Sequence, residues 1–185
     1  MSGIKRKAIS GGESLLRGKK SKKRLYGDVR YRVAVPAATV SPSLHRVFVD
    51  GACSGNHHRR QNERKGGYGI FFEDTSVSAS GTLPDKSLGV TNNRLELIAV
   101  VKLLSNVLDN VYEHVRPDDE LRVVGDNQYV LNMALDWLPK WRARNYCKAD
   151  GSGVENDDLV RQLDALLLEF ERCRRPLSFQ WVRAH

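Results

Sequence analysis

The sequence predicts an α/β fold in which helices pack against a mixed β-sheet. Three β-rich runs come first and are separated by turns, which is typical of an antiparallel meander. A long apolar helix follows, and two short buried strands then alternate with further helices. The resulting order, βββ-α-β-α-α-β, implies a mixed sheet with the helices against it.

The meander is predicted from three runs that end at glycine or at turn residues. Residues 46–50 (Arg-Val-Phe-Val-Asp) are closed by Gly51, and residues 67–72 form a second strand. Residues 76–83, which have mostly short side chains, form a third strand.

The later elements follow from hydrophobic periodicity. Residues 92–110 carry apolar side chains at 95, 98, 101, 104 and 108 and also at 97, 100, 103 and 107, which predicts a long, mostly buried helix. Residues 120–125 predict a short buried strand, 127–135 a helix and 177–182 a last strand. A second amphipathic helix over 156–173 turns its apolar residues inward, namely Leu159, Leu163, Leu166, Leu167 and Phe170.

The first 44 residues predict a disordered basic tail and linker, and residues 45–185 a single folded domain. Residues 1–32 hold 11 Lys/Arg and 2 Asp/Glu, whereas the other 153 residues hold 19 and 20. The basic runs at 5–7 and 19–24 predict a nuclear localisation signal or a phosphate-binding arm, with a solubilising tail as the alternative. We therefore expect a nuclear protein, or otherwise a cytoplasmic one.

Composition excludes several classes of protein. With 41% hydrophobic and 28% charged residues, the chain can form a core and is not wholly disordered. No apolar run reaches the roughly 18–20 residues of a membrane span, and the basic start lacks the apolar centre of a signal peptide. The three cysteines form no C-x-x-C pair, which argues for reduced thiols and against a zinc finger.

Three acidic residues stand where elements of an α/β fold assemble sites: Asp50 and Asp126 end apolar strands, and Glu96 lies in the first turn of the buried helix. Each has a simpler explanation. Asp50 with Gly51 could form a turn, Asn93 to Glu96 fits a capping box, and Asp126 could cap the next helix.

If the fold brings the three carboxylates together, they need protons or a dication. Two carboxylates about 4 Å apart repel by about 4 kcal/mol at an effective dielectric constant near 20. Oxygen ligands without nearby His or Cys favour Mg²⁺ or Mn²⁺ over zinc. Periodicity alone does not show that the three side chains converge.

Several motifs, in the same order along residues 45–185, resemble type 1 ribonuclease H. They are Val49-Asp50-Gly51-Ala52-Cys53-Ser54-Gly55-Asn56 with Gly66-Gly67-Tyr68-Gly69, Thr91-Asn92-Asn93-Arg94-Leu95-Glu96-Leu97, Gly125-Asp126-Asn127-Gln128-Tyr129-Val130, the basic segment 136–144, the segment 154–159, and Trp181-Val182-Arg183-Ala184-His185.

The resemblance implies a ribonuclease H-like fold with a five-stranded sheet, three strands antiparallel and then two parallel. It implies an endonuclease that hydrolyses the RNA strand of RNA–DNA hybrids with two Mg²⁺ ions, or Mn²⁺ in their place. By resemblance Asp50 would bridge the ions, Glu96 and Asp126 would complete the site of the second ion, and His185 would aid proton transfer or product release.

The chain departs from the family pattern at its end. It stops at His185, before the family's fourth carboxylate and its closing C-terminal helix. We expect a fragment or truncated product of an active enzyme, which leaves open the activity of this chain itself. The alternatives are a catalytically impaired protein that binds hybrid or duplex nucleic acid, and a detached domain of a polyprotein.

We expect a monomer that does not contact membranes. The resemblance also implies how this chain would bind its substrate. Asn56, Asn93 and Gln128 match positions that contact the minor groove, and Thr91 and Asn156 match a pocket for a DNA-strand phosphate. The basic segment combines positive charge with aromatic rings, a combination that suits duplex binding; its predicted contacts are Trp137, Lys140, Trp141, Arg142 and Arg144. Tryptophans packed in the core beneath a solvated helix are the alternative.

Overall fold

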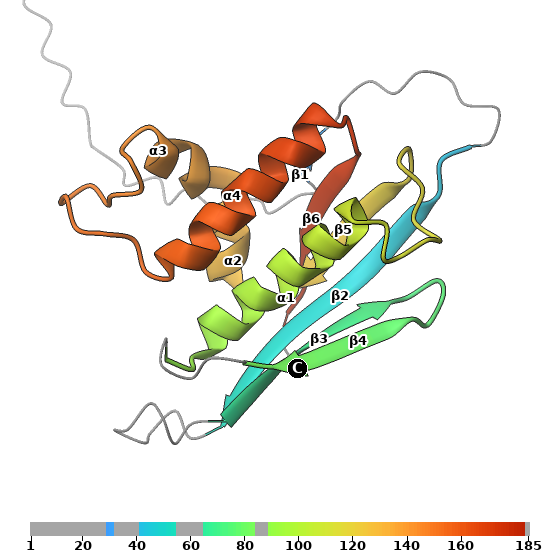
Figure 1. The fold of residues 1–185 in the computed structure, drawn as a ribbon, viewed down its shortest axis with the longest axis horizontal. Coiled ribbons are helices and arrows are strands. Elements are labelled where there is room, and N and C mark those ends of the chain that lie inside the picture. The colour runs from blue at the N-terminus through green and yellow to red at the C-terminus, as the bar shows by residue number, and fades with distance from the viewer. Residues whose placement is uncertain (1–28, 32–40, 55–64, 84–88, 184–185) are drawn as a thin grey trace, which may run out of the picture.

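The computed structural model describes residues 29–31, 41–54, 65–83 and 89–183. Its strands form one sheet in the order β1-β6-β5-β2-β3-β4 (Figure 1). The strands are β1 (Val29–Tyr31), β2 (Leu44–Ser54), β3 (Lys65–Phe72), β4 (Ser78–Thr82), β5 (Glu120–Gly125) and β6 (Leu177–Trp181).

The mixed sheet confirms the predicted fold class. β2 pairs with β3, and β3 with β4, in antiparallel register, while β2 with β5 and β5 with β6 are parallel. β1 adds a sixth strand, antiparallel to the edge strand β6, with Val29 opposite Phe179. The sequence gives no signal for β1, because a strand of three residues is too short to show a period-2 pattern.

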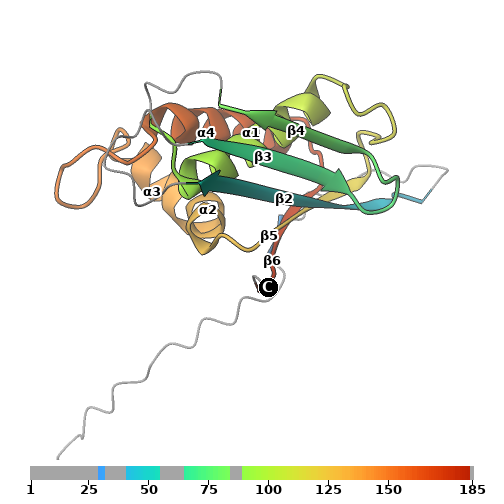
Figure 2. The ribbon, with the colours of Figure 1, turned by 90° about the horizontal axis from the view of Figure 1, so that it is seen from below.

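Helices α1 and α4 cover one face of the sheet. Figures 1 and 2 show α1 and α4 side by side over the same face, and α1 packs against β2, β3 and α4. The helices are α1 (Asn92–Leu108), α2 (Gln128–Asn132), the π-helical turn η3 (Met133–Trp137), α3 (Leu138–Arg142) and α4 (Asp157–Arg172).

The helix predicted over 127–135 continues further, but with a widened turn. The backbone N–H of Leu138 bonds to the carbonyl of Met133, five residues earlier, where an α-helix uses the fourth. Pro139 follows directly; it has no N–H, and its ring would clash with the carbonyl four residues before it. A π-turn opens the ladder at this point, so the chain passes from α2 into α3 without leaving helical conformation.

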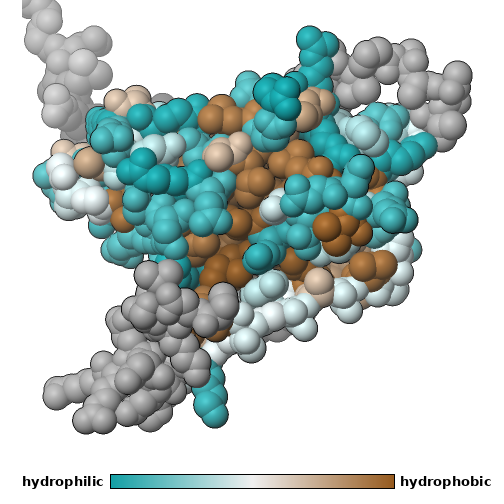
Figure 3. Space-filling view, in the orientation of Figure 1, coloured by the Kyte–Doolittle hydropathy of each residue, from teal (hydrophilic) through white to brown (hydrophobic). Residues whose placement is uncertain are grey.

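The core lies between the sheet and α1. Leu95, Leu97, Leu103 and Leu104 of α1 are fully buried, and Phe72 of β3 is buried with them. Each such side chain stabilises the fold by about 1.5–3 kcal/mol through removal of apolar surface from water. Figure 3 shows apolar residues across the middle of the face that carries the helices, with hydrophilic residues around them. No helix in the described ranges has both the length and the apolar character needed to cross a bilayer.

Candidate active site

Asp50, Glu96 and Asp126 meet beside the central strands β2 and β5, although they come from three different elements. One carboxylate oxygen from each lies within 4.8 Å of the others. The register explains part of this arrangement. Phe48 of β2 pairs with Val124 of the parallel strand β5, so the residues two positions further along, Asp50 and Asp126, reach the same level.

The structure excludes the three simpler explanations of these acids. Asp50 and Gly51 lie inside β2 and not in a turn. The N-cap of α1 is Thr91, so Glu96 is not the acid of a capping box that starts at Asn93; it is the fifth residue of the helix, just past the first turn in which it was predicted. The N-cap of α2 is Asn127 and not Asp126. The three carboxylates therefore have no capping or turn-forming role.

Gly51 lets α1 approach β2 closely enough to bring Glu96 beside Asp50. A Cβ atom built on Gly51 would lie 2.5 Å from the carbonyl carbon of Leu95 and would also overlap the backbone nitrogen of Glu96. Only glycine fits between the two backbones. The sequence showed Gly51 as the end of a strand, whereas its function is this contact with α1.

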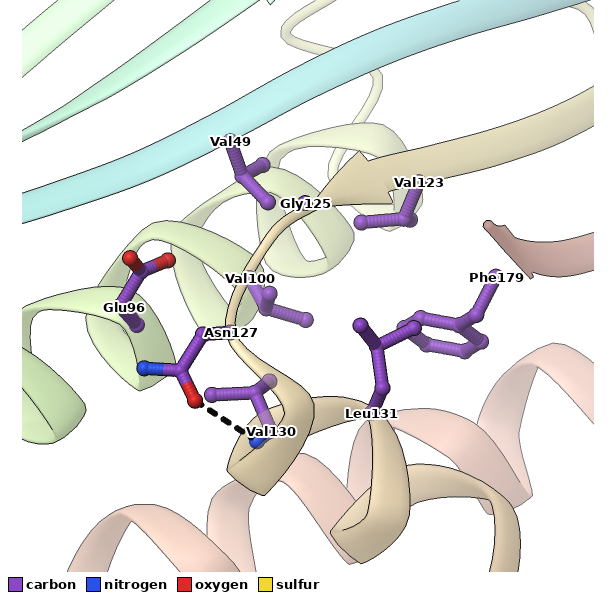
Figure 4. A pocket seen from close by; sticks show the side chains of 9 residues that line it. All are labelled: Val49, Glu96, Val100, Val123, Gly125, Asn127, Val130, Leu131 and Phe179. Atoms are coloured by element: carbon purple, nitrogen blue, oxygen red, sulfur yellow. Dashed lines mark hydrogen bonds between the residues drawn. The ribbon is translucent and has the colours of Figure 1, made fainter. Parts of the chain in front are cut away.

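Glu96 holds its proton unusually tightly. Burial, and after it the charges of Asp50 and Asp126, together raise the pKa of Glu96 from 4.5 to about 8, while a hydrogen bond from the Gly51 backbone opposes the shift. Figure 4 shows the apolar side chains on one side of Glu96 that remove it from water; they line a small cavity and include Val49, Val100, Val123, Val130 and Leu131.

This donor set fits a hard dication. The group consists of three carboxylates without His or Cys, and hard ions such as Mg²⁺ prefer oxygen ligands. A dication would also offset the burial and the repulsion from Asp50 and Asp126 that raise the pKa of Glu96. The acidic group could therefore hold a metal ion.

Arg94 joins the two residues that were predicted to bind a phosphate. Thr91 Oγ1 accepts a hydrogen bond from the backbone N–H of Arg94 (3.2 Å), and the guanidinium Nη1 donates to Asn156 Oδ1 (3.2 Å). The same guanidinium binds both carboxylate oxygens of Asp158, at 2.9 and 2.5 Å, and lowers the pKa of that carboxyl. Arg94 was not among the predicted site residues, although its position as a basic residue among the buried apolar residues of a helix indicated a buried partner.

Asn93 and Gln128 lie on the neighbouring helix starts. Asn93 is half-buried in the first turn of α1, and Gln128 is the exposed first residue of α2. Asn127, which the sequence analysis did not select, donates from Nδ2 to Asn93 Oδ1 (3.0 Å). Trp181 fixes the backbone beside them, because its indole N–H donates to the carbonyl of Asp126 (2.9 Å).

The predicted duplex-binding residues of the basic segment divide into two groups. Trp137 and Trp141 are half-buried against the core and contact each other, with ring centroids 5.4 Å apart. Lys140 and Arg144 are exposed, and Lys140 pairs with Asp136 at 2.7 Å.

The guanidinium of Arg142 binds Asp164 of α4. Nε and Nη2 of Arg142 donate to the two carboxylate oxygens of this buried residue, at 2.8 and 2.5 Å. The hydroxyl of Tyr146 donates to the same carboxylate (2.7 Å). Burial alone would raise the pKa of Asp164, but these bonds lower it. The basic segment is thus anchored to α4.

The remaining two predicted site residues, Asn56 and His185, lie outside the described residues. The two basic runs of the tail, at 5–7 and 19–24, also lie outside them.

Comparisons with known proteins point to one family. Residues 43–185 match the family model of RNase H. The chain is 33% identical over 141 residues to Ribonuclease HI of Caulobacter vibrioides, covering 75% of this chain and 79% of the relative. It is 35% identical over 141 residues to Ribonuclease H of Stutzerimonas stutzeri, covering 75% and 78%.

Solved structures share the fold at lower sequence identity. The crystal structure of LC9-RNase H1, a type 1 RNase H with the type 2 active-site motif, has a TM-score of 0.57 and 20% identity over 80% of this chain and 66% of that one. The solution structure of the PFV RNase H domain has a TM-score of 0.58 and 15% identity over 78% and 82%.

The predicted nuclear localisation is wrong. The relatives from Caulobacter vibrioides, Stutzerimonas stutzeri and Thiobacillus denitrificans are bacterial. Bacteria have no nucleus. Short basic runs occur for many reasons, so their presence alone did not distinguish a localisation signal from a solubilising tail.

Proposed function

Because the chain belongs to the RNase H family, as its resemblance to type 1 ribonuclease H predicted, we propose that it hydrolyses the RNA strand of RNA–DNA hybrids. The observation that carries the proposal is the convergence of Asp50, Glu96 and Asp126, with one oxygen of each within 4.8 Å of the others. These three acids have no capping or turn-forming role, and the burial of one of them, Glu96, makes its ionised form costly to the fold.

We assign to the three carboxylates the binding of two Mg²⁺ ions, with Mn²⁺ as a substitute. Asp50, Glu96 and Asp126 would hold these ions. Two such ions supply an activated water and stabilise the leaving 3′ oxygen of a phosphodiester. Glu96 gives up its proton when it binds metal, since its pKa of about 8 leaves it mostly protonated at neutral pH.

The chain's own residues hold the substrate over this site. Thr91 and Asn156, which Arg94 joins, bind a phosphate of the DNA strand. Asn56, Asn93 and Gln128 contact the minor groove, where the 2′-hydroxyls of RNA are exposed. Lys140 and Arg144, both exposed on the segment that Asp164 anchors, bind backbone phosphates. His185 assists proton transfer or product release.

The test is hydrolysis of a hybrid whose RNA strand carries the label, with Mg²⁺ or Mn²⁺, beside single-stranded RNA and a DNA duplex of the same sequence. We expect cleavage of the RNA strand of the hybrid alone. Asp50→Asn should reduce the rate by a factor of about 10²–10³, the value of losing a few kcal/mol of charge stabilisation, while hybrid binding persists.

A matched control is Asp109→Asn, which changes an exposed carboxylate at the opposite end of α1 and should leave the rate unchanged. Tight binding of the hybrid without hydrolysis under either ion would contradict the proposal and would support the alternative of a hybrid-binding protein. Equal cleavage by Asp50→Asn and by the unchanged chain would contradict the assignment of the metal ligands.

A further inference from the structure

Asn127 combines two tasks at the start of α2. Its Oδ1 accepts hydrogen bonds from the backbone N–H groups of Tyr129 (2.9 Å) and Val130 (3.4 Å), and so caps the helix. Its Nδ2 donates to Asn93 Oδ1 (3.0 Å), which belongs to α1 and lies 34 residues earlier in the chain. One side chain therefore connects the starts of two helices beside the three carboxylates.

The helix cap fixes which way round the Asn127 amide stands. A backbone N–H can only donate, so the atom of Asn127 that faces α2 must be the oxygen. Figure 4 shows this oxygen bonded to Val130, with the amide nitrogen turned away from Val130 toward α1. The orientation of this amide is thus set by two donors whose positions the backbone determines.

This orientation in turn fixes the amide of Asn93. The Nδ2 group of Asn127 can only donate, so the atom of Asn93 that faces it must be the carbonyl oxygen. The NH₂ group of Asn93 is then the part left to bind something else, and no described residue accepts a hydrogen bond from it. Asn93 is half-buried and adjoins the carboxylate site through Glu96, three residues later on the same helix.

We propose that Asn127 is a positioning residue that makes Asn93 a hydrogen-bond donor toward a 2′-hydroxyl oxygen of the RNA strand. This inference rests on the proposed function. A free asparagine amide presents its oxygen or its nitrogen with similar ease, whereas the bond from Asn127 selects the nitrogen. A 2′-hydroxyl is present on one strand of the hybrid and absent from DNA, so a fixed donor favours the hybrid.

The residue type at 127 suits this task. Ser, Thr, Asp and Asn all cap helices well. Asp has no donor for Asn93, and the hydroxyl of Ser ends closer to the backbone than the amide nitrogen of Asn. Among these four residues, asparagine alone caps α2 and also reaches Asn93 with an N–H group.

The experiment compares the dissociation constants of a hybrid and of a DNA duplex with the same sequence, in the Asp50→Asn background, which slows hydrolysis by the factor given above. Asn127→Ser keeps the cap but loses the donor to Asn93, and Asn127→Asp keeps the cap and the length but offers only acceptors. We expect each to reduce the preference for the hybrid by about 3- to 10-fold, the value of one hydrogen bond. Both duplexes carry the same phosphates, so the charge of Asp weakens both equally.

The decisive arm is a double-mutant cycle with Asn93→Ala. If Asn127 acts through Asn93, Asn127→Ser should have no further effect on the preference once Asn93 is alanine. Asn106→Ser, which removes an amide bonded to Tyr112 near the far end of α1, is the matched control and should change nothing. Thermal unfolding verifies that each variant is folded.

The outcomes separate the two proposals. If the Asp50→Asn chain prefers the hybrid and Asn127→Ser leaves that preference unchanged, or lowers it equally with and without Asn93, the inference is overturned and the proposed function stands. Equal weakening of hybrid and DNA binding by Asn127→Ser also overturns it. A chain with no preference for the hybrid overturns the proposed function, and the inference with it.

Discussion

Raising the pH of the metal-free protein through the range of about 4.5 to 8 should lower its free energy of unfolding, because Glu96 has a higher pKa in the fold than in the unfolded chain. Below pH 4.5 Glu96 is protonated in both states and costs nothing. Above pH 4.5 Glu96 ionises in the unfolded chain before it ionises in the fold, and this ionisation lowers the free energy of the unfolded state. The pKa rises from 4.5 to about 8 on folding, so the loss reaches up to about 5 kcal/mol when Glu96 is finally ionised in the fold.

The same shift predicts proton release on metal binding. At pH 7, one unit below the pKa of Glu96, roughly nine molecules in ten hold the proton. Because a metal ligand must be ionised, binding of the ion that Glu96 would hold should displace about 0.9 proton per chain at this pH. The affinity should fall about tenfold for each pH unit below 8 and level off above it.

Titration calorimetry with Mg²⁺ and with Mn²⁺ in two buffers of different ionisation enthalpy measures the released protons directly. Denaturant unfolding of the unchanged chain and of Glu96→Gln, followed against pH, measures the cost of ionisation. Glu96→Gln should remove most of the slope between pH 5 and 8, since its amide carries no charge. Glu155→Gln, at a side chain that is 73% exposed, is the control and should retain the slope.

Two results would refute this reasoning. One is a metal affinity that stays constant between pH 6 and 8 without proton release. The other is a Glu96→Gln variant whose stability falls with pH as steeply as that of the unchanged chain. Either would mean that burial and the neighbouring acids do not hold the proton on Glu96.

Three further predictions concern the surroundings of the site. Arg142→Ala should lower the free energy of unfolding by about 2–4 kcal/mol, because the buried Asp164 loses two hydrogen bonds. Arg144→Ala should leave the free energy of unfolding unchanged and reduce the log–log salt slope of hybrid binding by about 0.9. Equal stability of the two variants would contradict this prediction. Gly51→Ala should lower both stability and metal affinity, because the added methyl group would overlap the α1 backbone. Thermal unfolding and calorimetry measure the two effects. A fully stable variant with unchanged affinity would disprove the close contact. Burial alone would raise the pKa of Asp119, but its hydrogen bonds from Arg116 and neighbouring groups lower it. Asp119 should therefore stabilise the fold above about pH 4 and lose that contribution as the pH falls. Asp119→Asn should weaken the dependence of the free energy of unfolding on pH in the acidic range.

Local patterns predicted most of the fold. The strand over Glu120–Gly125 has the predicted bounds, α1 begins at the predicted residue and ends two residues early, and α4 is one residue shorter than predicted at each end. Period-2 and period-3.6 patterns arise from backbone geometry within a few residues, so they are visible without the partner elements. The three-residue strand β1 and the π-turn before Pro139 were missed, because the first depends on the β6 edge and the second on a local adjustment around one proline.

The candidate metal site was visible in the sequence as three acids at the ends of strands or near the start of a helix, but each acid alone had an equally good local explanation. The contacts between elements removed those explanations: Thr91 and Asn127 occupy the two caps, and Gly51 lies within a strand.

The amino-acid order alone therefore determined where most strands and helices form and which acids follow apolar runs, because those properties depend on neighbours in the chain. Only the tertiary structure decided which polar side chains meet. Asn127 reaches Asn93 across 34 residues, Arg94 reaches Asp158 across 64, and Arg142 reaches Asp164 across 22. Hydrogen bonds act over about 3 Å, and such proximity between distant residues is set by the packing of whole elements and not by any local pattern.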